Sequence, residues 1–133
     1  MKPLQNDGMM KVSSVVAVLD DEPSFGRALA RLLREDGYEV ELFSDGKSLL
    51  TAQIRKPSDC ILLDLQMPEM DGFAVLQQLS AKENMRIPVI IVTAHDLVSH
   101  RQRAASLGAS DYLTKPVDEA ILLNAIRTCL AAG

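Results

Sequence analysis

The sequence has few cysteines, no long apolar run and no block of like charges, and each absence narrows the class of protein. Its two cysteines, Cys60 and Cys129, lie far apart and belong to no C-x-x-C or Cys/His pattern. We therefore interpret both as small core residues. Reduced thiols of this kind are typical of the cytoplasm, where we expect the protein to reside.

The longest apolar runs are only as long as a strand, so no segment is expected to span a membrane. Residues 1–14 are polar and lack the apolar centre of a signal peptide. The net charge of −4 comes without clusters of Lys and Arg, which argues against direct binding to nucleic acid. The 133 residues, 47% of them hydrophobic, fit one domain with one sizeable core. We expect a flexible lead-in over residues 1–13 and a single domain over residues 14–132.

The apolar pattern switches repeatedly between the period of a strand and that of a helix. Val15–Leu19 is an apolar run typical of a strand buried on both faces. Tyr38–Phe43 alternates apolar and acidic residues, which predicts an edge strand with one exposed face. The predicted strands are Val15–Leu19, Tyr38–Phe43, Cys60–Leu63, Val89–Val92 and Asp111–Leu113. The predicted helices run from Pro23 to before Gly37, from Gly46 to about Arg55, from Gly72 to about Lys82, from about Leu97 to Leu107, and from Asp118 to about Leu130.

Strands that alternate with helices in this way predict an α/β fold of the (βα)5 type. Such a chain forms a doubly wound, parallel five-stranded sheet with right-handed crossovers and helices on both faces. We predict the strand order 2-1-3-4-5. In an open sheet of this class, ligands bind at the carboxyl ends of the strands. Polar residues follow the ends of four of the predicted strands and should converge there: Asp20, Asp21, Asp64, Thr93 and Lys115.

Three carboxylates at one edge of a sheet predict a cation site. They repel one another unless a cation joins them, and Mg²⁺ suits a half-open set of oxygen ligands. A carboxylate is also a competent nucleophile toward phosphorus. Lys115 would supply positive charge to a phosphoryl group, and Thr93 could hydrogen-bond one of its oxygens. Each residue alone also has an ordinary interpretation: a solvated turn for the acidic pair, a helix cap for Asp64, a strand end for Thr93 and a turn for Lys115.

Four segments resemble the signature segments of response-regulator receiver domains of two-component signal transduction. They are Val18–Glu22, Leu63–Gly72, Val92–Ala94 and Tyr112–Pro116. The second contains the highly specific pattern D-x-x-M-P-x-M-D-G, and the resemblance runs from Val15 to about Leu130. The segments Cys60–Asp64 and Ile87–Ile90 also resemble receivers of helix-turn-helix transcriptional regulators. The resemblance as a whole implies a flavodoxin-like receiver fold.

The resemblance assigns roles in a phosphoryl-transfer site. Asp64 would be the phosphoacceptor. Asp21 and Asp64 would bind Mg²⁺ (or Mn²⁺) directly, together with the backbone carbonyl of Gln66, while Asp20 would act mainly through a metal-bound water. Lys115 would pair with Asp64 and then with the phosphoryl group.

The resemblance also assigns switch and tuning residues. Thr93 and Tyr112 match the switch pair of the family. Gln66 and His95 would border the path of the attacking water and tune hydrolysis, although His95 could equally be an exposed loop residue. The resemblance further implies a cis peptide bond between Lys115 and Pro116. We expect the second histidine, His100, to be an exposed helix residue.

The implied partners are a sensor histidine kinase or a phosphotransfer protein. An output domain, fused or separate, would respond to the surface formed by the helix from Leu97, the strand from Asp111 and the helix from Asp118. A homodimer formed on phosphorylation also fits this class. The domain would catalyse only its own phosphorylation and dephosphorylation.

Two other functions remain as alternatives. A haloacid-dehalogenase-like phosphatase also uses an aspartate after a strand, but it needs a second aspartate where this chain has Gln66. A small-molecule-binding α/β module is disfavoured by the absence of G-x-G-x-x-G and G-x-x-x-x-G-K-[ST] segments.

Overall fold

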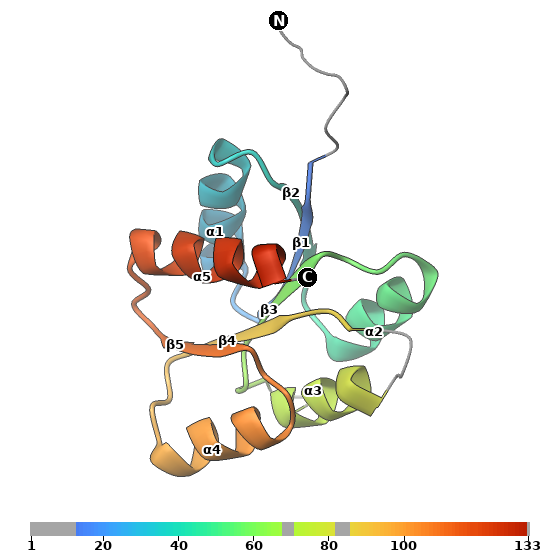
Figure 1. Ribbon diagram of the computed structural model, residues 1–133, viewed down its shortest axis with the longest axis vertical. Helices are drawn as coiled ribbons and strands as arrows, with labels where there is room; N and C mark the ends of the chain where they lie inside the picture. The colour runs from blue at the N-terminus through green and yellow to red at the C-terminus, as the bar shows by residue number, and fades with distance from the viewer. Residues whose placement is uncertain (1–12, 68–70, 82–85, 133) are drawn as a thin grey trace, which may run out of the picture.

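The computed structural model describes residues 13–67, 71–81 and 86–132, and within them five parallel strands form one sheet (Figure 1). The strand order is β2-β1-β3-β4-β5, which confirms the predicted fold class and order. In chain order the elements are β1 (Val15–Leu19), α1 (Pro23–Glu35), β2 (Glu39–Phe43), α2 (Gly46–Arg55), β3 (Cys60–Leu63), α3 (Gly72–Ala81), β4 (Val89–Thr93), α4 (Val98–Ser106), β5 (Asp111–Thr114) and α5 (Glu119–Ala132).

These bounds lie close to the predicted ones. The strand β2 begins at Glu39 and the helix α4 at Val98, each one residue later than predicted. The predicted end of α3 at Lys82 and nearly all of the predicted lead-in lie outside the described residues. No helix in the described part of the chain is long and apolar enough to cross a membrane.

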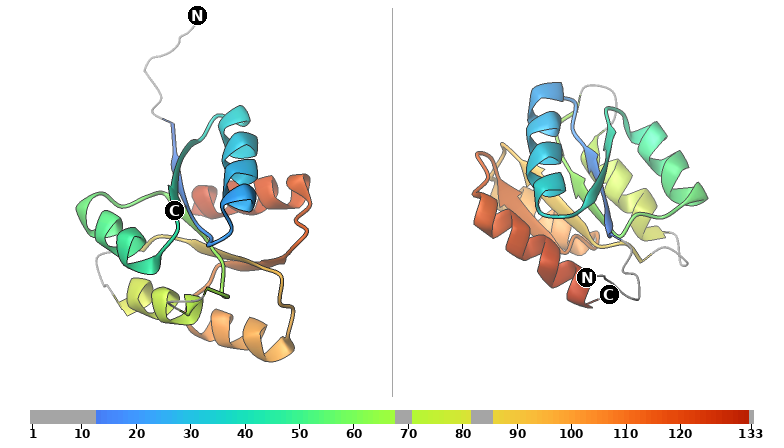
Figure 2. Two further views of the ribbon diagram at one scale, coloured as in Figure 1. Left: turned by 180° about the vertical axis from the view of Figure 1, so that it is seen from behind. Right: turned by 90° about the horizontal axis from the view of Figure 1, so that it is seen from above.

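The helices α1 and α5 cover one face of the sheet and α2, α3 and α4 the other, as Figures 1 and 2 show. Between the sheet and each set of helices lies one apolar layer. Successive residues of a strand point to opposite faces, so each buried strand contributes to both layers. We call them the α1/α5 layer and the α2–α4 layer after the helices that cover them. Buried members of the first are Val16, Val18, Leu29, Leu33, Cys60, Leu62, Ile90, Val92, Leu122, Ala125 and Ile126. Buried members of the second include Ala17, Leu19, Leu49, Ile61, Leu63, Phe73, Val75, Leu76, Leu79, Ile91 and Ala104.

The strand β2 is an edge strand, as its alternating sequence predicted, but it is more exposed than expected. Leu42, which the alternation assigns to the covered face, is 42% exposed. The helix residue opposite it is Gly26, whose missing side chain would lie 3.7 Å from Leu42 Cδ2. The exposure of Leu42 therefore follows from the lack of a side chain on α1 at this point.

Caps fix the ends of several helices. The side chain of Asp45 accepts a hydrogen bond from the backbone N–H of Ser48 at 2.8 Å at the start of α2. Asp118 accepts one from the N–H of Ile121 at 3.0 Å at the start of α5, as its sequence position predicted. Gly37, after α1, has a φ of +96°, a conformation that favours glycine.

Both cysteines lie within the α1/α5 layer. Cys60 is fully buried on β3, and burial raises the pKa of its thiol to about 12. Cys129 is half-buried on α5 and packs against the same layer. The interpretation of both as core residues is confirmed.

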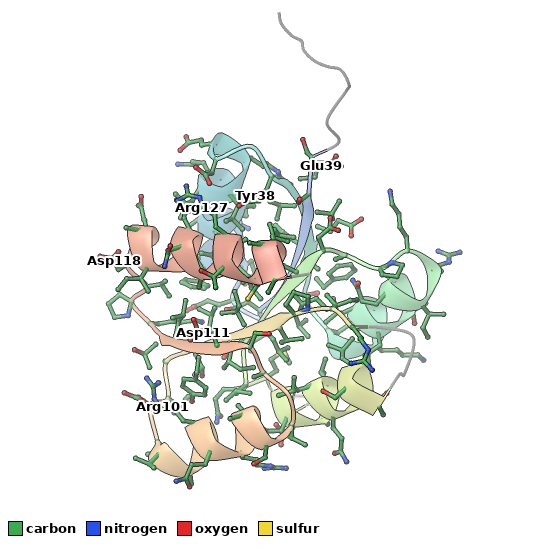
Figure 3. All side chains as sticks on the ribbon, viewed as in Figure 1. Tyr38, Glu39, Arg101, Asp111, Asp118 and Arg127 are labelled. Atoms are coloured by element: carbon green, nitrogen blue, oxygen red, sulfur yellow. The ribbon has the colours of Figure 1, made fainter. Side chains whose placement is uncertain are left out.

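Two helices make polar contacts with neighbouring loops that the sequence pattern did not predict. Gln53 of α2 is fully buried; its amide donates to Ser58 Oγ at 3.0 Å and accepts from the Ser58 N–H at 2.6 Å. Arg127 of α5 donates to Asp36 at 3.2 Å and lies near Tyr38 (Figure 3). The first fixes the connection into β3, whereas the second is an exposed ion pair that contributes little stability.

Candidate phosphoryl-acceptor site

Three carboxylates meet at the carboxyl edge of the sheet, as the sequence predicted. One oxygen from each of Asp20, Asp21 and Asp64 lies within 4.8 Å of the others. Asp20 and Asp64 are each only 6% exposed, whereas Asp21 is exposed. The cluster therefore has a buried floor and one side open to solvent.

The register of the sheet brings these carboxylates together. The strands β1 and β3 are parallel neighbours in which Leu19 is paired with Leu63, so Asp20 and Asp64 follow at the same level. The Asp64 N–H donates to the Leu19 carbonyl at 3.0 Å. Because both strands are buried on both faces, the two aspartates have little freedom to move apart.

Lys115 reaches the cluster from the residue after β5. Its Nζ lies 2.9 Å from Asp20 Oδ2, 3.6 Å from Asp64 Oδ2 and 3.8 Å from Glu22 Oε1. The ion pair with Asp64 is thus present, but the hydrogen bond goes to Asp20. Neither Glu22 nor this choice of partner was predicted. The peptide bond from Lys115 to Pro116 is cis, as the resemblance implied.

The charges at this edge shift the titration of Asp64 and Lys115. Burial raises the pKa of Asp64, and the charge of Asp20 adds to the rise, while the Gln66 N–H, Lys115 and Thr93 oppose it. Burial acts to lower the pKa of Lys115, but its hydrogen bond to Asp20 and the nearby negative charges outweigh burial and raise it. Burial therefore disfavours the ionised form of Asp64, while the neighbouring carboxylates favour the protonated form of Lys115.

The backbone after Asp64 is held by a close contact with the start of α3. The Gly72 N–H donates to the Leu65 carbonyl at 3.1 Å. A Cβ on Gly72 would lie 2.3 Å from the Asp64 carbonyl oxygen and 2.6 Å from Leu65 Cα, distances that only glycine permits. The Gln66 N–H donates to Asp64 Oδ1 at 3.2 Å, while the Gln66 side chain is exposed.

The predicted switch residues lie beside the cluster. Thr93 is fully buried at the end of β4, and its carbonyl accepts the Lys115 N–H at 2.8 Å. Tyr112 is half-buried against the α2–α4 layer, and its hydroxyl donates to the His95 carbonyl. The His95 side chain lies on an exposed loop.

A surface residue of α4 joins this loop to Tyr112. The Arg101 guanidinium lies 4.7 Å from the centroid of the Tyr112 ring and donates to the carboxylate of Asp96. No sequence signal indicated these contacts, because they depend on side-chain conformation.

The prediction that His100 is an exposed helix residue is wrong. Its ring is partly buried and packs edge-on against Phe73 of α3, with 5.5 Å between ring centroids. The face of α4 that carries His100 therefore turns toward α3 rather than solvent.

A doubly wound parallel sheet with an acidic cluster and a lysine at its carboxyl edge is typical of α/β receiver domains of signal transduction. The chain belongs to the response regulator receiver domain family of two-component systems, because the model of that family, described as "Response regulator receiver domain", matches residues 16–127.

Similar proteins support this membership. The chain is 41% identical over 118 residues to the sensory transduction protein RegX3 of Mycolicibacterium smegmatis, and 38% identical over 118 residues to the response regulator protein TodT of Pseudomonas putida. Each alignment covers 89% of this chain but only 51% and 52% of the relative. The chain thus spans about half the length of these curated relatives.

Solved structures of similar fold include chemotaxis protein CheY4 of Vibrio cholerae, with a TM-score of 0.84 and 27% identity over 90% of this chain and 100% of that one. Another is the receiver domain of sensor histidine kinase PA1611 from Pseudomonas aeruginosa, with a TM-score of 0.82 and 30% identity over 90% of this chain and 99% of that one. The latter structure has a magnesium ion coordinated in its active-site cleft.

The comparisons give no support to the prediction that nucleic acid is not a direct partner. A further relative, TcrX of Mycobacterium tuberculosis, 37% identical over 80% of this chain and 46% of its own length, is described as a probable transcriptional regulatory protein. TcrX is longer than the region that this chain matches, which is 46% of its length.

Proposed function

We propose that this domain accepts a phosphoryl group on Asp64 in a Mg²⁺-dependent reaction and relays that event through the surface formed by α4, β5 and α5. The observation that carries the proposal is the cluster of Asp20, Asp21 and Asp64 together with Lys115, whose ammonium group forms ion pairs with Asp20 and Asp64. Residues 14–132 form the receiver unit in this proposal. The donor is a sensor histidine kinase or a phosphotransfer protein in the cytoplasm.

The transfer exchanges one bond to phosphorus for another. An oxygen of Asp64 forms the new bond, while the bond from phosphorus to the donor atom breaks and the donor atom keeps the electron pair. Lys115, within 3.6 Å of Asp64, neutralises charge on the phosphoryl oxygens. The Thr93 hydroxyl donates to one of them. Gln66 and His95 border the approach of water and tune the later hydrolysis.

The residues at the cluster suit a hard divalent cation. All three side chains offer carboxylate oxygens, and their oxygen atoms lie within 4.8 Å of one another. The pKa of Asp64 is raised mainly by burial and further by the charge of Asp20, and a bound cation would favour its ionised form. Asp21, Asp64 and the carbonyl of Gln66 would hold Mg²⁺ or Mn²⁺, with Asp20 acting through water. The bound cation would offset the repulsion among carboxylate and phosphoryl oxygens.

The Mg²⁺ dependence is testable with acetyl phosphate as donor. The parent should take up one phosphoryl group with Mg²⁺ and none with a chelator, as mass spectrometry would measure. Asp21→Ala should remain folded, since Asp21 is exposed, but should bind Mg²⁺ at least about tenfold more weakly because a direct ligand is gone. Glu41→Ala removes the same charge from the exposed strand β2 and should behave as the parent. Equal Mg²⁺ affinity in Asp21→Ala would show that the ligand assignment is wrong.

The switch is testable with beryllofluoride, a phosphoryl mimic. A phosphoryl group near Thr93 should draw its hydroxyl inward and move the loop at Ala94 and His95, which Tyr112 holds through its hydroxyl. Amide chemical shifts should therefore change from Asp64 through Thr93 to Tyr112 and α5. Shifts at the far end of the sheet, near Glu39, serve as the control. Changes limited to the acidic cluster would contradict the switch while leaving the phosphorylation proposal intact.

A further inference from the structure

Lys115 has an aromatic partner as well as its carboxylate partners. Its Nζ lies 4.1 Å from the centroid of the Phe25 ring. Phe25 lies in the first turn of α1, the helix that begins two residues after Asp21. The ring is partly buried against the α1/α5 layer, so packing holds it in place beneath the ammonium group.

The ring acts on the ammonium group differently from the carboxylates. A carboxylate oxygen accepts a hydrogen bond along defined directions, whereas the face of an aromatic ring attracts a cation without fixing the direction of its N–H bonds. The Lys115 side chain is only 15% exposed, a setting in which this attraction is stronger than at an open surface.

This difference matters because the ammonium group stands between two carboxylates. It is 2.9 Å from Asp20 and 3.6 Å from Asp64, so a rotation rather than a long displacement turns it from one to the other. A lysine stem has several rotatable bonds and would otherwise sample many positions. Over the ring face, the charge stays stabilised while its hydrogen bonds are exchanged.

We propose that Phe25 is a positioning residue for Lys115: its ring keeps the ammonium group beside Asp20 and Asp64 and lets it turn toward a phosphoryl group on Asp64. This inference rests on the proposed function for its consequence in catalysis. A role in core packing alone predicts instead that any apolar side chain of similar volume serves equally well at this position.

The test compares Phe25→Leu, which keeps apolar volume but removes the ring, with Phe25→Tyr, which keeps the ring. Phe43→Leu is the matched control, because Phe43 packs against the opposite layer of the sheet. The ring face should shift the Lys115 Cε proton resonances upfield in the parent and in Phe25→Tyr. That shift should be lost in Phe25→Leu and kept in Phe43→Leu.

The initial rate of phosphorylation by acetyl phosphate at saturating Mg²⁺ is the second readout. The rate should fall about fivefold in Phe25→Leu, because the ammonium group loses the cation–π contact that keeps it beside Asp64. It should stay within about twofold of the parent in Phe25→Tyr, which keeps the ring. The Mg²⁺ dissociation constant should not change in either variant. If the leucine variant unfolds, Phe25→Met replaces it in both measurements.

Two results overturn the proposal. One is a normal rate in Phe25→Leu, and the other is an equal loss in Phe25→Leu and Phe25→Tyr, which would indicate packing alone. The proton shifts need no phosphorylation. A parent that takes up no phosphoryl group therefore contradicts the proposed function, while the shifts still decide whether the ring positions the lysine.

Discussion

Asp64→Asn should take up no phosphoryl group from acetyl phosphate at any Mg²⁺ concentration. The side-chain amide is nearly the same size as the carboxylate but is not a nucleophile toward phosphorus. Mass spectrometry after incubation with the donor measures the result. Labelling of this variant at the level of the parent would mean that another residue is the acceptor.

The same variant should be at least as stable as the parent, which separates lost chemistry from lost folding. Burial and the charge of Asp20 raise the pKa of Asp64, so its ionised form is disfavoured in the folded state. A neutral side chain removes that unfavourable charge, and the thermal midpoint at neutral pH should be unchanged or higher. Glu41→Gln, on the exposed strand β2, is the control that neutralises an acid outside the cluster.

Gly72→Ala should have the largest effect on stability among the substitutions considered. A Cβ at this position would lie 2.3 Å from the Asp64 carbonyl oxygen and 2.6 Å from Leu65 Cα, so the backbone has to move. Such overpacking costs about 3 kcal/mol or more. Because the displaced backbone is that of the acceptor itself, the phosphorylation rate should fall on the order of a hundredfold. Chemical denaturation and the acetyl phosphate assay measure the two effects.

Gly26→Ala is the matched control for that substitution. The new Cβ would meet only Leu42 Cδ2 at 3.7 Å, an ordinary van der Waals distance, within the interior of α1. Alanine is the better helix former, so this variant should gain about 0.5–1 kcal/mol and phosphorylate normally. Gly72→Ala with the stability and rate of the parent would refute the steric argument.

The sequence predicts the sheet and the position of the site well, for a physical reason. Apolar runs such as Val15–Leu19 and Cys60–Leu63 have the length of strands and are rich in Val, Ile and Leu, which favours buried strands. Parallel strands bring their carboxyl ends to one edge of the sheet. The polar residue after each strand is thereby brought to the same edge of the sheet. This placement can be predicted without knowing any side-chain conformation. Asp20, Asp64 and Thr93 all lie where this argument puts them.

What the sequence does not predict depends on contacts between side chains far apart in the chain. Lys115 chooses Asp20, 95 residues away, over Asp64 as its hydrogen-bond partner. Phe25 has the helical spacing of an ordinary core residue, and nothing in that spacing distinguishes its contact with the lysine. The partial burial of His100 arises from its edge-on contact with the Phe73 ring of α3, which helical spacing does not reveal. Such contacts are decided by differences of about an ångström in side-chain position, for example 2.9 Å against 3.6 Å for the two partners of Lys115. The periodicity of a sequence only assigns residues to the faces of helices and strands.

The two apolar layers on opposite faces of the sheet have a consequence for how such a domain changes during evolution. Substitutions in different layers share no side-chain contacts, so their effects on folding should be close to additive. The strand β5, like the other strands, contributes to both layers: Tyr112 packs against the α2–α4 layer and Leu113 against the α1/α5 layer. The surface of α4, β5 and α5 therefore includes one helix from each layer, because α4 packs on the α2–α4 layer and α5 on the α1/α5 layer. Mutations in either layer can therefore alter the shape of this surface. The acidic cluster should be less affected, because Asp20 and Asp64 follow the central strands β1 and β3.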